Sequence, residues 1–386
     1  MKKRFKITLA SIAILLITAG CKSTHLQQGK DDNKLPTDHQ ENVMIKTDWI
    51  AHVTQGDKGK YYFYRPAVDH HTLFITDYRG NIFAYDRLKN KNIWKDTLKS
   101  AIISSPVYGD NKVYFATANH LLFALNAENG RVIWHAQLPA EVIDTPSYGP
   151  NLLVVKTING ELLGFEPDNG YQKWSYQETI PRFVLRQNSP PKIEYPYVFS
   201  GFANGKIVAL AADSGKLVWE RTIAQPVGFS ELMRMVDITG ELHVEDDTLF
   251  VSSYHGNVAA LDARNGEVKW LRELSSKSGL AVNKSHVIVT DSDGMIWALD
   301  RSSGDVVWRQ NELKNHMLSA PVILGDLIII ADKVGKIYVI ADTDGHFIAR
   351  KSLNVSGIIS APVVYDNKIY VVSIDGHVIS LTTQLH

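Results

Sequence analysis

The chain has 386 residues, of which 45% are hydrophobic and 21% charged, so its composition is that of a globular protein and not of a disordered one. Lys and Arg number 41 and balance 41 Asp and Glu, which argues against a nucleic-acid binder that relies on a global basic field. The single cysteine, Cys21, excludes a disulfide scaffold and cannot build a zinc or iron–sulfur site by itself.

The first twenty residues have the pattern of a secretory signal. Four basic side chains lie within residues 2–6, and an apolar run follows from Ile7 to Ile17. That run is shorter than the about 20 residues that a membrane-spanning helix needs, and the small residues Thr18-Ala19-Gly20 follow it. We therefore predict that residues 1–20 are a signal peptide, whose removal leaves 37 basic and 41 acidic residues, a net charge of −4.

The cysteine directly after Ala-Gly resembles a bacterial lipoprotein signal, although Thr18 stands where that pattern prefers Leu. The resemblance implies cleavage before Cys21 and acylation of its thiol and new amino terminus; the alternative is an ordinary secretory signal with a chance cysteine. Lys22 stands where an aspartate would resemble an inner-membrane retention signal, which implies the outer membrane, with the protein facing the periplasm. Residues 21–46 are predicted to be a lipidated flexible tether, because they contain too few large apolar residues to offset their ordering entropy.

The rest of the chain repeats with a period near 40 residues. A Gly-x-x-x-Trp turn and strand, with Asn90 replacing the first glycine, recurs at Trp94, Trp134, Trp174, Trp219, Trp270 and Trp308. Each full unit shows four β-rich runs separated by turn residues, a pattern typical of a β-propeller blade. A seventh unit has Ala349 in the tryptophan position, and an eighth ends at His386 before any fourth strand.

The strand missing from the eighth unit lies at the other end of the repeat region. Trp49 begins a strand-like segment with no upstream strands of its own, and we expect it to pair with Gly357–Leu381. The prediction is an all-β, eight-bladed β-propeller of four-stranded antiparallel blades over residues 47–386, closed by the N-terminal strand. The tryptophans are expected to pack between blades as core residues, and a neighbour is expected to fill the smaller contact at Ala349.

The unit Ala-Leu-Asp-Ala-x-x-Gly-x-x-x-Trp resembles the pyrroloquinoline-quinone-type propeller repeat, and Ser319-Ala320-Pro321-Val322 fits its first strand. Eight such units behind a lipoprotein signal resemble the BamB family, lipoprotein subunits of the outer-membrane β-barrel assembly complex. The resemblance implies a non-enzymatic scaffold that binds the periplasmic domains of the central barrel subunit and aids insertion of β-barrel proteins. Strand addition at sheet edges or on the concave ring surface is a further way in which nascent outer-membrane proteins could bind.

Two other functions remain open at this point. Quinone-dependent dehydrogenases share such blades, but they are longer and typically have adjacent cysteines and a calcium site. Asp291-Ser292-Asp293-Gly294 resembles the start of a calcium loop, yet Ser302 occupies its twelfth position, where a bidentate Glu is needed. We therefore predict no cofactor, no metal site and no catalytic residues. The second alternative is a ligand- or glycan-binding propeller.

The regular period fails at two neighbouring connections. The intervals from Trp174 to Gly205 and from Trp219 to Gly256 are 31 and 37 residues, whereas the others are 24 to 27 residues. Both join an outer strand to the next inner strand, so both are expected to emerge on the same face of the ring. Function is expected there, since insertions in repeat proteins are commonly placed on a binding face.

The residues of these two connections match the partner-binding segments of the BamB family. The resemblance assigns partner binding to Arg182, Phe183, Leu185 and Arg186 in the first connection and to Glu231, Arg234 and Asp237 in the second. Phe183 stands where the family often has Leu, and Thr239 where it often has a second Asp. The alternative is that Phe183, Leu185 and Met235 fold back on the propeller and leave the charges merely solvated.

Overall fold

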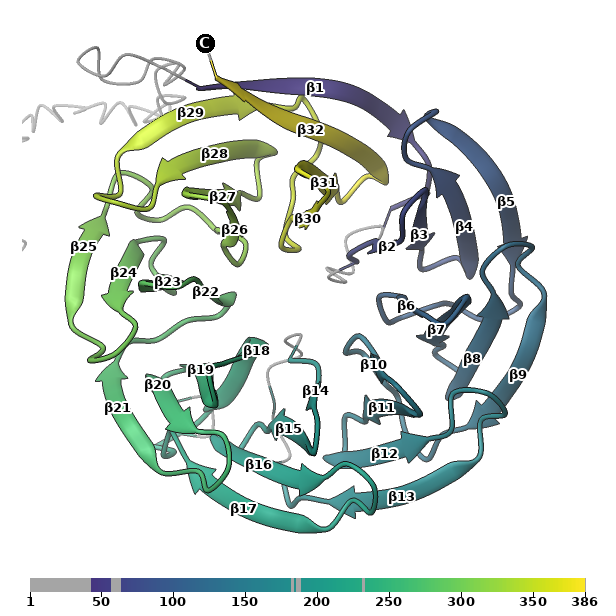
Figure 1. The fold of residues 1–386 in the computed structure, drawn as a ribbon, viewed down its shortest axis with the longest axis horizontal. Helices are drawn as coiled ribbons and strands as arrows, with labels where there is room; N and C mark the ends of the chain where they lie inside the picture. The colour runs from purple at the N-terminus through teal and green to yellow at the C-terminus, as the bar shows by residue number, and fades with distance from the viewer. Residues whose placement is uncertain (1–42, 57–63, 182–183, 185–188, 231–232, 386) are drawn as a thin grey trace, which may run out of the picture. The chain divides into compact units, whose positions relative to one another are not determined.

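The computed structural model describes residues 43–385 except 57–63, 182–183, 185–188 and 231–232. In these residues, eight four-stranded antiparallel sheets stand around a common axis, as Figure 1 shows. Seven sheets run in chain order from the innermost to the outermost strand. The predicted eight-bladed propeller is therefore confirmed. In the part of the chain described, no helix is long and apolar enough to cross a membrane.

The strand boundaries follow the predicted period of four strands per blade. Blade 1 contains β2 (Ala67–Val68), β3 (Thr72–Thr76), β4 (Asn81–Asp86) and β5 (Lys91–Thr97). Blade 2 contains β6 (Val107–Gly109), β7 (Lys112–Ala116), β8 (Leu121–Asn126) and β9 (Val132–Gln137). Blade 3 contains β10 (Ser147–Gly149), β11 (Leu152–Lys156), β12 (Glu161–Phe165) and β13 (Gln172–Gln177). Blade 4 contains β14 (Lys192–Glu194), β15 (Tyr197–Gly201), β16 (Lys206–Ala211) and β17 (Leu217–Thr222).

The second half of the ring has the same organisation. Blade 5 contains β18 (Asp237–Glu245), β19 (Thr248–Tyr254), β20 (Asn257–Asp262) and β21 (Val268–Glu273). Blade 6 contains β22 (Gly279–Val282), β23 (His286–Thr290), β24 (Ile296–Asp300) and β25 (Val306–Gln310). Blade 7 contains β26 (Val322–Leu324), β27 (Leu327–Ala331), β28 (Lys336–Ala341) and β29 (Phe347–Ser352). Blade 8 contains β30 (Val363–Tyr365), β31 (Lys368–Val372), β32 (His377–Leu385) and the N-terminal β1 (Val43–His52).

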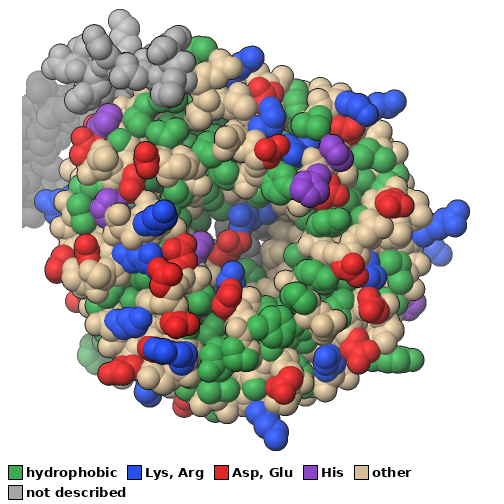
Figure 2. All heavy atoms as spheres, in the orientation of Figure 1, with side chains coloured by type: hydrophobic (Ala, Val, Ile, Leu, Met, Phe, Trp, Pro, Cys, Tyr) green, Lys and Arg blue, Asp and Glu red, His purple; other side chains and the backbone are tan. Residues whose placement is uncertain are grey.

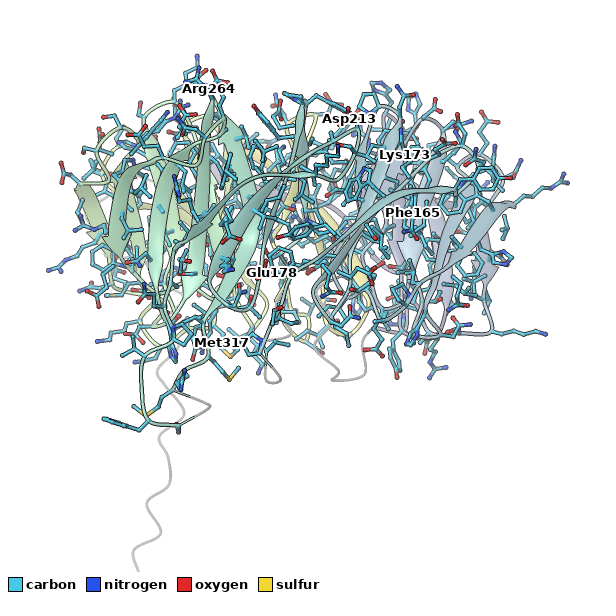
Figure 3. All side chains as sticks on the ribbon, turned by 90° about the horizontal axis from the view of Figure 1, so that it is seen from below. Phe165, Lys173, Glu178, Asp213, Arg264 and Met317 are labelled. Atoms are coloured by element: carbon cyan, nitrogen blue, oxygen red, sulfur yellow. The ribbon has the colours of Figure 1, made fainter. Side chains whose placement is uncertain are left out.

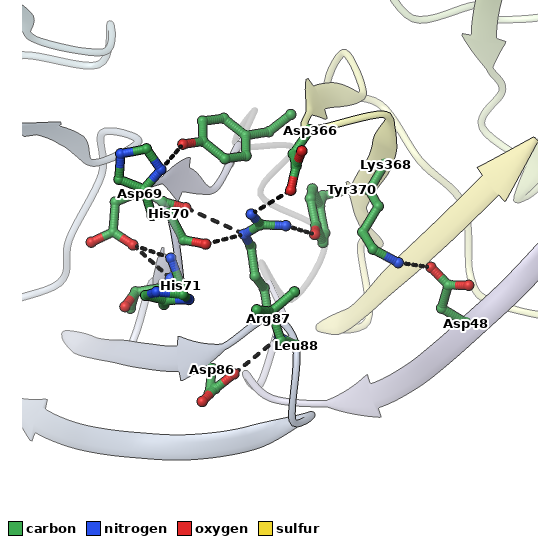
Figure 4. A network of polar contacts seen from close by, with 12 residues as sticks. Asp48, Asp69, His70, His71, Asp86, Arg87, Leu88, Asp366, Lys368 and Tyr370 are labelled. Carbon is green, nitrogen blue, oxygen red and sulfur yellow. Dashed lines mark hydrogen bonds and ion pairs between the residues drawn. The ribbon is translucent and has the colours of Figure 1, made fainter.

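Blade 8 joins the two ends of the described chain. β1 pairs with β32 antiparallel, with Trp49 opposite Ser380, as predicted. Strand β1 begins at Val43, four residues before the boundary of 47 expected from the repeats. The carboxylate of Asp48 accepts a hydrogen bond from the Lys368 ammonium at 2.5 Å, which ties β1 to β31 (Figure 4).

The seam between blades 8 and 1 is also held by Arg87, whose side chain is almost completely buried. Its guanidinium donates to the Asp366 carboxylate and to the Tyr370 hydroxyl, both at 3.1 Å (Figure 4). Its backbone carbonyl accepts a hydrogen bond from the Trp49 indole at 3.0 Å. The ring is thus closed by strand pairing within blade 8 and by polar contacts to the next blade.

Seven tryptophans link their blades to the next blade in the same way, at every junction except that between blades 7 and 8. Each indole N–H donates to a backbone carbonyl of the next blade at 2.8–3.0 Å, in the pairs Trp49–Arg87, Trp94–Ala127, Trp134–Pro167, Trp174–Ala212, Trp219–Ala263, Trp270–Arg301 and Trp308–Asp342. The exception is Trp297, whose indole donates to Asp291 within its own blade at 2.8 Å. The repeat tryptophans are therefore inter-blade core residues. Each fills space between two blades and gives a backbone carbonyl of the next blade a hydrogen-bond donor.

A turn of the next blade covers six of these tryptophans. A Cβ added to the turn glycine would lie 2.4–2.7 Å from the ring, in the pairs Gly130–Trp94, Gly170–Trp134, Gly215–Trp174, Gly266–Trp219, Gly304–Trp270 and Gly345–Trp308. These glycines also adopt positive φ, as does Asn90 (φ 53°), which replaces glycine in the first blade. At the six turns with glycine, a side chain would displace the indole.

The same geometry explains why Ala349 replaces tryptophan. In blade 8 the third and fourth strands, β32 and β1, come from opposite ends of the chain, so no turn connects them. Among the described residues, blade 8 therefore has no turn equivalent to the one that covers the indole in the other blades. Ala349 instead shares a buried cluster with Ile45 of β1, so the expected filling by a neighbour is observed.

Candidate functional site

The two long connections leave from one face of the propeller. The first joins β13 to β14 and the second joins β17 to β18. Figure 3 shows Glu178, the residue after β13, and Met317 on the lower side, whereas Lys173, Asp213 and Arg264 lie toward the upper side. We call the lower side the connection face, because there each outer strand leads to the inner strand of the next blade.

The predicted site residues fall partly outside the described residues. Cys21, Arg182, Phe183, Leu185, Arg186 and Glu231 all lie in segments that the structure does not describe. Arg234 is exposed, and its backbone N–H donates to the Ser230 carbonyl at 3.0 Å in a single turn. Asp237 begins β18 and is only 7% exposed. The two described residues therefore differ, since one side chain faces solvent and the other lies in the protein.

A small pocket of about 50 Å³ lies where the two connections approach each other. The first connection contributes Ile180 and Val184, and Asp237 comes from the end of the second. The other lining residues come from blades 3 and 4 and from the segment before blade 3, and include Ile143, Asp144, Lys156, Thr157, Ile158, Gly160, Phe202 and Ala203. The pocket brings the ends of the two predicted partner-binding segments together.

The pocket combines apolar lining residues with three charged ones, Asp144, Lys156 and Asp237. Lys156 Nζ lies 3.1 Å from Asp144 Oδ2, and both side chains are largely buried. Burial raises the pKa of Asp237 to about 7; the Asp144 charge raises it further, whereas the Lys156 charge lowers it. The ammonium of Lys156 is thus paired with Asp144, and its charge also acts on Asp237. Sequence reasoning did not identify Asp144 or Lys156, although an alignment of the repeat units would have shown charges where other blades have none.

The pKa of Asp237 leads to a prediction for Asp237→Asn. Because the folded-state pKa lies above the ordinary aspartate value of 3.8, the folded chain retains a proton that the unfolded chain releases between about pH 4 and 7. The carboxyl therefore lowers stability as the pH rises through this range, and the effect is constant above it. Asp237→Asn should raise the free energy of unfolding by about 1–3 kcal/mol at pH 8 and have little effect at pH 4. Urea titrations at both pH values measure this, and a loss of stability at pH 8 would contradict it.

Apolar side chains of the second connection project into solvent. Val227 is 76% exposed, Met233 is 57% exposed and Phe229 is fully exposed, close in sequence to the exposed Arg234. Aromatic residues, Met and Arg are enriched at protein interfaces, and a fully exposed phenyl ring buries no surface within its own chain. Met235 is half-buried, so the folding back considered from the sequence applies to part of this segment only.

The centre of the ring contains a separate polar feature. Arg65, which precedes β2, forms an ion pair with Glu241 of β18, so blades 1 and 5 contact each other across the channel. The adjoining cavity has a volume of about 250 Å³, and Figure 2 shows oppositely charged side chains around the central hollow. Arg65 is the main cause of a lowered pKa of Glu241. Among the described residues, no group of three or more His, Cys, Asp or Glu side chains could hold a metal ion.

The aspartate that begins the calcium-like segment is used within its own turn. Asp291 Oδ1 accepts hydrogen bonds from the N–H groups of Asp293 and Met295, both at 2.9 Å. Its Oδ2 accepts the Trp297 indole N–H. Asp332 makes the same pair of contacts, to Val334 and Lys336, in blade 7. These contacts are those of a blade turn.

Comparison with known proteins places the chain in a family. The family model described as outer membrane protein assembly factor BamB matches residues 49–123, 80–310 and 303–384. The outer membrane protein assembly factor BamB of Pseudomonas aeruginosa is 40% identical, over 82% of this chain and 85% of that protein. The protein of the same name from Legionella pneumophila is 38% identical, over 83% and 85%.

Solved structures agree on the fold. The crystal structure of BamB from Moraxella catarrhalis has a TM-score of 0.81 at 24% identity, covering 88% of this chain and all of that one. The quinohemoprotein alcohol dehydrogenase from Comamonas testosteroni has a TM-score of 0.72 at 12% identity, covering 88% and 76%, a likeness of fold alone. The sequence matches to both relatives and to the family model cover most of the propeller. The chain therefore belongs to the family of the outer membrane protein assembly factor BamB, whose members are non-catalytic assembly factors.

Proposed function

We propose that the protein is a lipid-anchored periplasmic scaffold that binds the periplasmic domains of the central barrel subunit of the outer-membrane assembly complex. The docking segments are Arg182–Arg186 in the first connection and Glu231–Asp237 in the second. The observation that carries the proposal is the exposure of Phe229 and Met233 beside Arg234, on the face where both long connections emerge. Such anchors gain most from burial in a partner, because they are now surrounded by water.

The docking proposal is tested by co-purification of the barrel subunit from membranes. One variant carries Leu185→Glu and Arg186→Ala, and a second carries Phe229→Ala and Arg234→Glu. Each is expected to reduce partner recovery about tenfold or more, since interface anchors commonly contribute over 1 kcal/mol each. Met317→Ser is the matched control, because Met317 is 62% exposed on the same face but follows blade 6. Unchanged recovery with folded docking variants would overturn the proposal.

We propose that the anchor is Cys21, acylated after removal of residues 1–20, and that the tether to the outer membrane leads from Cys21 to the start of β1 at Val43. The last four residues of the predicted tether, 43–46, therefore belong to the propeller. Two or more acyl chains give stable attachment, whereas a single chain binds only marginally. Mass spectrometry of the mature amino terminus should find an acylated cysteine as the first residue. A mature protein that retains Cys21 as a free thiol would contradict the anchor but would leave the docking proposal intact.

A further inference from the structure

Lys156 is exceptional among equivalent positions in the eight blades. It pairs with Leu162, the second residue of the third strand in its blade. The residues at the same register position elsewhere are small or uncharged: Thr76, Ala116, Gly201, Ser252, Thr290, Ala331 and Val372. The charge therefore occurs only in blade 3, from which the first long connection departs.

Asp144, the residue that pairs with Lys156, also differs from its counterparts in other blades. In blade 2 the Ala116 N–H donates to the Ser104 hydroxyl at 2.8 Å, and in blade 7 the Ala331 N–H donates to the Ser319 hydroxyl at 3.0 Å. Asp144 stands two residues before a proline, as Ser104 and Ser319 do. An alanine–serine contact in two other blades is thus replaced in blade 3 by a buried ion pair.

The ammonium of Lys156 connects three parts of the chain. It lies 3.1 Å from Asp144, and it donates to the carbonyls of Ser189 at 2.6 Å and Gly201 at 3.0 Å. Asp144 also accepts the Ser189 backbone N–H at 2.8 Å. Ser189 is the buried end of the first long connection, and Gly201 ends β15 of blade 4. All three donors of the ammonium are therefore engaged.

The second long connection ends at the same place. Asp237 lines the pocket together with Asp144 and Lys156. Its neighbour Ile238 packs directly on Gly201, where an added Cβ would lie 2.3 Å from Ile238 Cγ2. Gly201, whose carbonyl accepts a hydrogen bond from Lys156, therefore also contacts the start of β18. The buried ammonium of Lys156 therefore contacts the end of the first connection and lines one pocket with Asp237 at the end of the second.

A buried ion pair is weak support for stability, because removing two charges from water offsets much of their attraction. Blades 2 and 7 fold with alanine and serine at these positions, so the blade itself does not require the charges. We propose that Lys156 is a positioning residue, which acts with Asp144 to hold the ends of both long connections in one arrangement for docking. The inference rests on the proposed function for its binding consequence, whereas the positioning can be measured without a partner.

The test replaces the ion pair in blade 3 with the alanine–serine contact found in blades 2 and 7. Lys156→Ala alone should lower the Tm, because it leaves Asp144 buried without its counter-ion. The double variant Lys156→Ala with Asp144→Ser should recover most of that loss. In the double variant, amide hydrogen exchange in peptides spanning residues 178–193 should still be about tenfold faster, as expected for loss of the hydrogen bonds that anchor Ser189. Affinity for the barrel subunit should fall about tenfold or more.

Lys112→Ala is the matched control. Lys112 begins β7, whereas Lys156 ends the equivalent strand, so it lies toward the opposite face. Its ammonium also joins two blades, through Asp110 at 2.8 Å and Asp168 at 3.0 Å. Lys112→Ala should leave exchange in residues 178–193 and partner affinity unchanged.

Two results would overturn the inference. One is unchanged exchange in residues 178–193 of the folded double variant, and the other is an equal acceleration in Lys112→Ala. Failure of the proposed function has a different signature. In that case the double variant exchanges faster, yet the Leu185→Glu/Arg186→Ala variant recovers the barrel subunit normally, so positioning holds and the docking assignment fails.

Discussion

Replacing Trp219 with alanine is expected to lower the free energy of unfolding by about 3–5 kcal/mol, the usual range for a large buried aromatic residue. Trp219 is 7% exposed, lies 5.8 Å from Phe199 between ring centroids, and donates its indole N–H to Ala263. The alanine variant would leave a cavity between blades 4 and 5 and a backbone carbonyl without its donor. Gly266, which lies against the Trp219 ring, has no side chain that could fill that cavity.

Trp297→Ala is the control for this effect. Trp297 is half-buried, and its indole contacts Asp291 in its own blade rather than the next one. The loss there should be about 1–2 kcal/mol, because less surface is uncovered and no contact between blades is broken. Urea titration of both variants gives the comparison. Equal losses would show that the repeat tryptophans do not hold the ring together in the way that the indole contacts indicate.

The fold could be predicted from the sequence because each blade is built from neighbouring residues. Tight turns and a tryptophan recur at nearly constant spacing, and both have local physical causes: positive φ at turns such as Gly266, and the match of an indole to the next blade. The closure by β1 followed from counting strands. The reason for Ala349 did not, because it depends on a turn that is absent only when the chain ends meet.

The candidate site was less predictable. Interval lengths identified the two connections, but they carry no periodicity that would tell which side chains are buried. Asp237 was assigned to partner binding and is 7% exposed in the structure, so its role in docking remains a proposal. The Arg65–Glu241 pair joins residues 176 positions apart on opposite sides of the ring, which no local pattern encodes. Lys156 and Asp144 were missed because each is unremarkable until the blades are compared position by position.

Deletion of residues 43–52 is expected to abolish the cooperative unfolding transition. Without β1, the outer edge of β32 becomes unpaired along its whole length, and such edges promote aggregation. The deletion also removes the Trp49 contact to Arg87 of blade 1 and the Asp48 contact to Lys368 within blade 8. Only the Arg87 side chain, through Asp366 and Tyr370, would keep its polar contacts across this seam among those described above. Circular dichroism and size exclusion should find an expanded or aggregated chain. A deleted chain that melts at the native Tm would show that β1 is dispensable for closure.

A circular permutant separates the loss of the strand from the loss of its sequence position. Val43 lies opposite Leu385 in the β1–β32 register, so the end of β32 and the start of β1 are adjacent. Joining Leu385 to Val43 through Asn-Gly, with new termini in an exposed loop, would turn the two strands into a hairpin. This chain should fold with a Tm close to that of the parent, because the pairs from Val43–Leu385 to His52–His377 are kept. Recovery by the permutant, together with failure of the deletion, would establish that pairing of β1 with β32 closes the ring, whichever end of the chain supplies the strand.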